Sequence, residues 1–270
     1  MAKAKRIRVG IGGWDFDPWR GTFYPEGLAK ARQLEFASRA LTAIEINATY
    51  YRLQNKDLFA RWAKTVPDGF QFAVKASRFC TNRKRLGEGG EAIAKFCAQG
   101  LTELGDRLGP ILWQFMGTKQ FEPEDFQAFL DLLPHAQDGV RLRHAVEPRH
   151  ESFRDPRFVA MARKAGVAIV FADADDYPCI ADVSGDFVYA RLQRSREEEA
   201  TGYAEAELDR WAEVAQAWAR GESPAGFPYV AETPAPVMPR DTYIFVISGA
   251  KVRAPAAARA LIARLKDDNA

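Results

Sequence analysis

The segment LRHAVEPRHESFRDPRFVAMARKAGVAIVF, residues 142–171, contains one complete strand–helix–strand unit. Residues 142–147 and 167–171 are short runs typical of buried strands. Between them, Asp155 and Pro156 are typical of a helix start, because Asp accepts hydrogen bonds from first-turn amides and Pro fits an early helical position. Two strands joined through a helix are expected to lie parallel in one sheet.

The same alternation runs along the rest of the chain. Eight strands in 270 residues predict a (β/α)8 TIM barrel, a single domain over residues 1–270, with a doubly wound sheet as the alternative. The unit after the sixth strand is irregular, since no helix is predicted before residue 187, and residues 224–239 are predicted to form an ordered proline-rich loop. The other predicted strands are 7–12, 43–47, 70–75, 111–115, 187–192 and 242–247; the other predicted helices are 28–41, 56–65, 90–104, 204–219 and 254–265, with one more beginning near 122–124.

The composition excludes several classes of protein. Hydrophobic residues make up 47% and charged residues 27%, which is ordinary globular usage and excludes disorder, collagen and coiled coil. Lys and Arg total 38 against 36 Asp and Glu, a net charge of +2, whereas proteins that coat nucleic acid are far more basic. Any anion site must therefore be a local cluster.

The cysteines and the apolar runs bear on where in the cell the protein is expected to lie. Cys80, Cys97 and Cys179 have no metal-type spacing and are expected to be reduced core thiols, which favours the cytoplasm. No apolar run approaches the length of a membrane span, so we expect no membrane partner. The sequence leaves the oligomeric state open.

Charged and amide side chains gather at the ends of the predicted strands. Side chains two positions apart leave the same face of a strand, and the carboxyl ends of parallel barrel strands meet at one mouth, where active sites lie. A hydrophobic core without a functional site is not expected to contain several acidic and basic side chains at this mouth, because burying unpaired charge is costly. Each charge taken alone could still be solvated or paired structurally. The residues are Glu45, Asn47, Lys75, Gln114, Glu147, Arg149, Asp173 and Arg191.

Several chemical roles are open to these groups. Arg149 and Arg191 are expected to hold an oxyanion bidentately, with Asn47 and Gln114 as further substrate contacts. Lys75 either stays cationic and binds a carboxylate or phosphate, or is desolvated and able to form a Schiff base. Glu45 and Glu147 are the first candidates for proton transfer.

The second-tier catalytic candidates are Asp173 and His150. His150 is the one histidine of three that adjoins the cluster, in the run Glu147-Pro148-Arg149-His150, and either carries a proton or orients the loop. No metal-ligand spacing is present, so no cofactor is predicted; a divalent metal held by carboxylates is the less favoured alternative.

Two loops complete the predicted site. The loop after the first strand holds Trp14 and further aromatics, which either stack on a sugar or base or plug the barrel mouth. The loop at residues 77–85 is basic and beside Lys75, so it either is solvated or contacts an anion, including a nucleic-acid backbone. Trp14 and Tyr50 are taken as substrate contacts.

The chain resembles the YecE-like proteins, named for domain of unknown function 72. The resemblance spans almost the whole chain and implies a (β/α)8 barrel of unestablished activity, for which nucleic-acid or phosphosugar chemistry has been suggested from fold analogy. It rests on Gly12-Gly13-Trp14, residues 19–25, Glu45 to Arg52, Phe72 to Lys75, Leu112 to Phe115, Glu147 to Phe153 and Tyr189 to Leu192.

The chain resembles a divergent member. The family commonly has Thr-His where Thr81 is followed by Asn82, and Arg-x-His-Gly where Arg191 is followed by Leu192-Gln193-Arg194. An asparagine pair common after the eighth strand is also replaced, around residues 247–249. Two acid/base or metal positions are therefore missing.

Three functions follow from these observations. The preferred hypothesis is a metal-independent enzyme acting on a small phosphorylated or carboxylated substrate at the mouth. The second is a protein that binds nucleic acid or cleaves phosphodiesters. The third is a catalytically inactive binding module.

Overall fold

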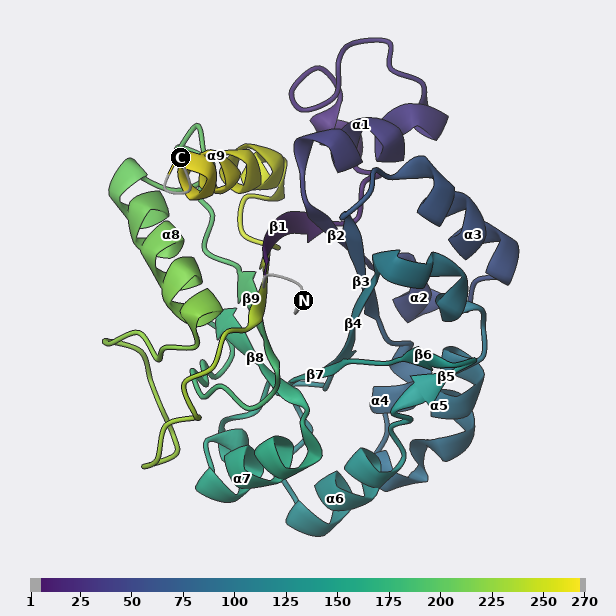
Figure 1. Ribbon diagram of the computed structural model, residues 1–270, viewed down its shortest axis with the longest axis vertical. Helices are drawn as coiled ribbons and strands as arrows, with labels where there is room; N and C mark the ends of the chain where they lie inside the picture. Colours follow the sequence, from purple (N-terminus) through teal and green to yellow (C-terminus); the bar gives the residue numbers. More distant parts are fainter. Residues whose placement is uncertain (1–5, 268–270) are drawn as a thin grey trace.

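The computed structural model describes residues 6–267 and confirms the (β/α)8 barrel (Figure 1). All neighbouring strands of the barrel pair in parallel, and the barrel closes in the order β1-β10-β9-β8-β7-β4-β3-β2. The barrel strands are β1 (Ile7–Gly12), β2 (Ala43–Ile46), β3 (Gln71–Lys75), β4 (Leu108–Gln114), β7 (His144–Glu147), β8 (Ala168–Asp173), β9 (Phe187–Leu192) and β10 (Asp241–Val246).

Helices surround the barrel as an outer layer (Figure 1). The longer helices each present an apolar face to the outward side chains of the strands, as an amphipathic helix requires. They are α1 (Gln33–Ala40), α3 (Lys56–Thr65), α5 (Gly90–Cys97), α6 (Pro123–Asp131), α7 (Pro156–Ala165), α8 (Glu205–Arg220) and α9 (Ala254–Asp267), with the short α2 (Ala48–Tyr51) and α4 (Arg78–Thr81). Within residues 6–267, no helix is long and apolar enough to cross a membrane.

Several predicted elements differ from those observed. The predicted helix 28–41 is a 3-10 turn, Lys30–Arg32, followed by α1. The predicted helix 90–104 stops at the end of α5, because Gly100 adopts φ 105° and the chain continues as a 3-10 helix, Leu101–Arg107. The hairpin of β5 (Ala136–Gln137) and β6 (Val140–Arg141), like the one-turn α2 and α4, lacks the hydrophobic period by which longer elements are predicted.

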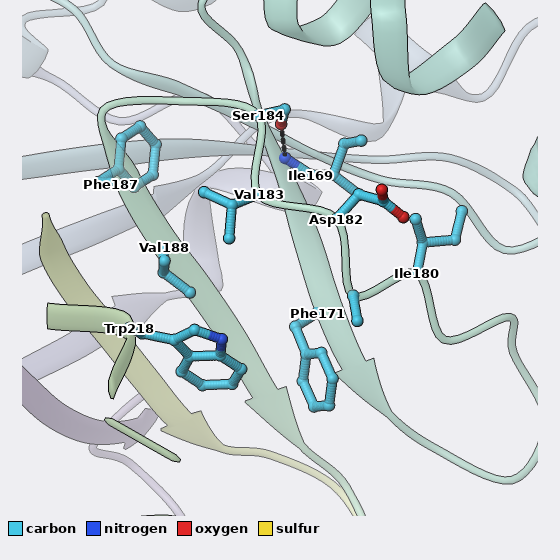
Figure 2. A pocket seen from close by; sticks show the side chains of 10 residues that line it. Ile169, Phe171, Ile180, Asp182, Val183, Ser184, Phe187, Val188 and Trp218 are labelled. Atoms are coloured by element: carbon cyan, nitrogen blue, oxygen red, sulfur yellow. Dashed lines mark hydrogen bonds between the residues drawn. The ribbon is translucent and has the colours of Figure 1, made fainter. Parts of the chain in front are cut away.

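The unit after β8 is irregular, as predicted, and an extended segment takes the place of a helix (Figure 2). Ile180 and Val183 are buried against the outer face of β8 and β9, beside Phe171 and Trp218. The Ser184 hydroxyl accepts from the Ile169 amide at 2.8 Å and donates to the Val167 carbonyl at 2.7 Å. The segment thereby covers strands that would otherwise expose apolar surface.

Alternation along the strands separates the two faces of the barrel wall. In β9, Phe187 and Tyr189 belong to the apolar cluster that fills the lumen, whereas Val188, Ala190 and Leu192 pack outward against the helices. Ala43, Ala73, Leu112 and Ala145 are the lumen residues of β2, β3, β4 and β7. The next inward position on each of these strands, two residues later, is polar.

Candidate functional site

Five strands contribute polar side chains to the C-terminal end of the lumen. Each follows a lumen residue by two positions, so strand alternation points it inward. These side chains are Glu45 on β2, Lys75 on β3, Gln114 on β4, Glu147 on β7 and Arg191 on β9.

Arg191 links two fully buried carboxylates. Its Nη1 donates to both carboxylate oxygens of Glu147 at 2.8 Å, and its Nη2 donates to Oε1 of Glu45 at 3.2 Å. The Tyr189 hydroxyl donates to Oε2 of Glu45 at 2.7 Å, and Nε2 of Gln114 donates to Glu147 at 2.5 Å. These residues form one connected network beneath the mouth.

The network sets the protonation states of Glu147 and Tyr189. Burial raises the pKa of Glu147, but Arg191, Arg149, Gln114 and Lys75 outweigh burial and bring this pKa to about 2. Burial and the neighbouring Glu45 raise the pKa of the Tyr189 hydroxyl well above its usual value. Glu147 is therefore ionised at neutral pH, and Tyr189 keeps its proton as a hydrogen-bond donor.

This geometry bears on two predicted roles. Arg191 was expected to hold a substrate anion, but both of its terminal nitrogens donate to Glu45 and Glu147, and it is 2% exposed. Glu147 was expected to transfer protons, but a carboxylate with so low a pKa is a poor proton carrier near pH 7. Both groups are placed to hold the site together.

Lys75 lies apart from this network. Its Nζ is 4.4 Å from the centroid of the Tyr50 ring, and among residues 6–267 it makes no hydrogen bond or ion pair. Burial and then Arg191 lower its pKa, Glu45 and Glu147 raise it, and the result is about 8. The Thr49 hydroxyl donates to the Lys75 carbonyl at 2.7 Å and so fixes the backbone beneath this amine.

Arg149 is the second cation at this mouth. Its guanidinium lies 4.1 Å from the centroid of the Tyr177 ring and donates to the Tyr177 hydroxyl at 3.2 Å. Its Nη2 is 3.6 Å from Oε1 of Glu147, a distance too long for a strong hydrogen bond. The side chain is 20% exposed, so it connects the buried network with solvent.

Asn47 lies at the start of α2, directly after β2. Its Nδ2 donates to the Glu45 carbonyl at 3.4 Å, a weak bond, and approaches Gly12 at the end of β1. The side chains that parity along the strands predicts to meet here, and that do so, are Glu45, Asn47, Lys75, Gln114, Glu147, Arg149 and Arg191. Tyr50, on α2, lies beside Lys75.

Asp173 does not face the lumen, which corrects the expectation for this residue. It shares parity with Ile169 and Phe171, which pack outward, and the lumen residue beside it is Ala172. Its carboxylate pairs with Arg194 at 3.1 Å. Asp173 therefore lies on the outer face of β8.

His150 and Trp14 are also held by local structure. Nδ1 of His150 accepts from the Ser152 amide at 3.2 Å and caps a 3-10 helix, Glu151–Phe153, which favours the loop-orienting alternative. The Trp14 ring packs on Trp62 and Phe72, with centroids 5.2 and 6.2 Å away, in the outer layer between α3 and β3. Trp14 is therefore not placed as a substrate contact.

The aromatic first loop and the basic loop at residues 77–85 differ in how the structure uses their side chains. In the first loop, Phe23 and Tyr24 pack on Phe36 of α1, so these two rings neither plug the mouth nor stack on a ligand. In the basic loop, Arg83 is used internally, donating to the Phe79 and Glu88 carbonyls. Its exposed cations are Arg78, Lys84 and Arg85.

Three residues of the site were missing from the sequence prediction. Tyr189 shares parity with Arg191, a signal that could have identified it; Tyr177 and Thr49 lie in irregular connections that carry no such signal. Among the described residues, no group of three or more His, Cys, Asp or Glu side chains could hold a metal ion.

Comparison with known proteins places the chain among uncharacterised relatives. A family model described as "Protein of unknown function DUF72" matches residues 8–270. The UPF0759 protein YunF of Bacillus subtilis (strain 168) is 32% identical over 159 residues, 56% of this chain and 54% of that protein, so the chain spans about half the length of this curated relative.

Two solved structures share the fold. A DUF72 family protein from Thermotoga maritima MSB8 aligns with a TM-score of 0.71 and 23% identity, over 97% of this chain and 98% of that chain. Another, from Enterococcus faecalis V583, aligns with a TM-score of 0.69 and 18% identity, over 97% and 96%. At these identities the likeness concerns the fold alone.

Proposed function

The chain belongs to the DUF72 family of proteins of unknown function, also called YecE, and we propose that it is an enzyme acting on a small anionic substrate at the C-terminal mouth of its barrel. The observation that carries this proposal is the contrast between Arg191 and the two other cations. Arg191 is neutralised by two carboxylates, whereas within the described part of the chain Lys75 has no carboxylate partner and Arg149 has only a long contact.

The charges of the mouth favour an anion. Glu45 and Glu147 carry two formal negative charges, and Arg191, Lys75 and Arg149 carry three positive charges when Lys75 is protonated. A phosphate or carboxylate placed between Lys75 and Arg149 would compensate the excess. The guanidinium of Arg149, oriented by Tyr177, supplies donors suited to such a group.

The functional groups then divide into two sets. The first set forms the floor of the site and holds its charged groups in place through hydrogen bonds; it consists of Glu45, Glu147, Gln114, Tyr189 and Arg191. Lys75 and Arg149 contact the substrate, with Tyr50 and Asn47 beside them. Lys75 also acts as the acid or base, because a pKa of about 8 lies close to neutral pH. The reaction needs no metal in this proposal, since the Glu45 and Glu147 oxygens already accept from Arg191, Tyr189 and Gln114.

Replacing Arg149 with Met should weaken anion binding without unfolding the protein. A charge-assisted hydrogen bond contributes about 1.5–3 kcal/mol, so we expect a roughly 10- to 100-fold higher Kd. Isothermal titration with inorganic phosphate and 3-phosphoglycerate measures this change.

The matched control is Arg154→Met in the same connection, whose side chain is exposed and pairs with Glu151. It should bind like the unmodified protein. Equal affinities for Arg149→Met and Arg154→Met would refute the anion site. Anion binding without conversion of any of a panel of phosphorylated and carboxylated compounds, followed by NMR, would instead favour an inactive binding module.

A second candidate is binding of single-stranded nucleic acid, favoured by an exposed patch beside the mouth. Tyr51 is 64% and Phe79 is 61% exposed, and Arg78 lies over the Phe79 ring at 5.4 Å. Aromatic faces interleaved with cations are typical of such surfaces. If this candidate is right, the protein binds to immobilised single-stranded DNA at low salt, and this binding falls steeply as the salt concentration rises. The Phe79→Ala variant should lose the binding.

A further inference from the structure

We propose that Lys75 forms a covalent imine with a carbonyl group of the substrate, which is then a 2-oxo acid or a phosphorylated ketone or aldehyde. The inference rests on the proposed function, because it uses the same mouth and the same anion contact at Arg149. It goes further by naming the substrate class and the nucleophile.

The surroundings of Lys75 suit a nucleophile. Its Nζ lies on the lumen face at the carboxyl end of β3, the end at which barrel enzymes carry out their chemistry. It lies over the Tyr50 ring, and among the described residues it makes no hydrogen bond, so no acceptor holds its protons and no donor holds its lone pair. The bond from Thr49 to the Lys75 carbonyl holds the backbone in place.

Another buried lysine shows the contrast. Nζ of Lys119 donates to Asp125 at 2.6 Å and to the Lys84 carbonyl at 2.9 Å, and its side chain is 5% exposed. That arrangement holds an ammonium as a structural cation. Lys75 is largely buried, but over residues 6–267 it has neither a carboxylate nor a carbonyl partner, and a purely structural lysine would require one.

The chemistry is a condensation that needs no oxidant or cofactor. The neutral amine of Lys75 attacks the carbonyl carbon, forming the C–N bond while the carbonyl oxygen takes up a proton. The resulting carbinolamine loses its hydroxyl as water and leaves a protonated imine, so one amine, one carbonyl and one proton give one imine cation and one water. Addition of water reverses the step.

The site accommodates each state of this reaction. With a pKa of about 8, roughly a tenth of the amine is neutral at pH 7, enough to start the attack. The imine cation carries the same charge as the ammonium it replaces, so Glu45 and Glu147 stabilise it in the same way. Arg149 holds the phosphate or carboxylate of the substrate.

Reductive trapping tests the inference on the unmodified protein. The full chain is incubated with pyruvate or dihydroxyacetone phosphate, reduced with sodium borohydride, and analysed by intact mass and peptide mapping. We expect one adduct per chain, located on Lys75, with a yield that rises with pH through about 8. Exposed lysines of the same sample, such as Lys30, provide the internal control.

The outcomes separate the two proposals. Both are supported by an adduct on Lys75 that is absent from Lys75→Met and Lys75→Arg. If the probes raise the melting temperature but leave Lys75 unlabelled, or label it no more than Lys30, the imine is refuted while the anion site stands. If the probes neither stabilise nor label the protein, and inorganic phosphate also fails to bind, both proposals are overturned.

Discussion

Replacing Arg191 with Met should destabilise the protein by about 3–5 kcal/mol. The substitution keeps an aliphatic stem but leaves Glu45 and Glu147, both fully buried, without the cation that they share. Removing one partner of a buried ion pair is far more damaging than breaking a surface pair, because the remaining charge is uncompensated. Urea unfolding at pH 7 measures the change in the free energy of unfolding.

Two further variants isolate the cause. Arg194→Met removes a half-exposed arginine that pairs with Asp173 and Asp175, and should change stability by less than about 1 kcal/mol. Adding Glu45→Gln and Glu147→Gln to Arg191→Met removes the uncompensated charges and should recover part of the loss. A loss below about 1 kcal/mol for Arg191→Met alone would contradict the network described.

Acidification should remove a stabilising contribution from Glu147. Its pKa in the folded protein, about 2, lies below the ordinary value of 4.5, so its ionised form favours the folded state above about pH 4.5. That contribution is lost as the pH falls from about 4.5 towards 2. A shift of this size corresponds to a contribution on the order of 3 kcal/mol, and the carboxylate is fully buried.

The Glu147→Gln variant makes this contribution measurable. The variant should be less stable than the unmodified protein at pH 7, and the difference should shrink steadily between about pH 4.5 and pH 3 in urea unfolding. Glu222→Gln is the control, since Glu222 is an exposed partner of Arg220 and should show little pH-dependent difference. A deficit for Glu147→Gln that is unchanged between pH 7 and pH 3 would show that Glu147 is not held ionised.

Strand alternation explains why most of the mouth could be predicted. Glu45, Lys75 and Glu147 each follow a small lumen residue by two positions, so one parity rule brings them together. The rule failed at Asp173, because β8 is buried on both faces and its apolar run does not reveal which parity faces the lumen. The prediction took the side of the strand that carries Phe171 as the lumen side, and this placed Asp173 inside the barrel. In the structure Phe171 packs outward, and Ala172 is on the lumen side.

The roles of the residues were less predictable than their positions. Nothing in the sequence indicates that Arg191 binds both glutamates, since this depends on the register that sets β2, β7 and β9 around the lumen. Likewise, Trp14 follows Gly13 at φ 73°, and its ring packs on the outer face of β3. The direction in which such a side chain points depends on tertiary packing rather than on the local sequence pattern.

The most direct test of the account is the titration of the Lys75 side chain by NMR in the intact protein. The resonance is assigned by its loss in Lys75→Arg, and the exposed Lys30 serves as reference. We expect a midpoint of about 8, because burial and Arg191 lower the pKa of an amine that pairs with no carboxylate among the residues the structure describes. A midpoint at the ordinary value near 10.5 would contradict it, since Lys75 would then be a solvated or ion-paired cation without special reactivity.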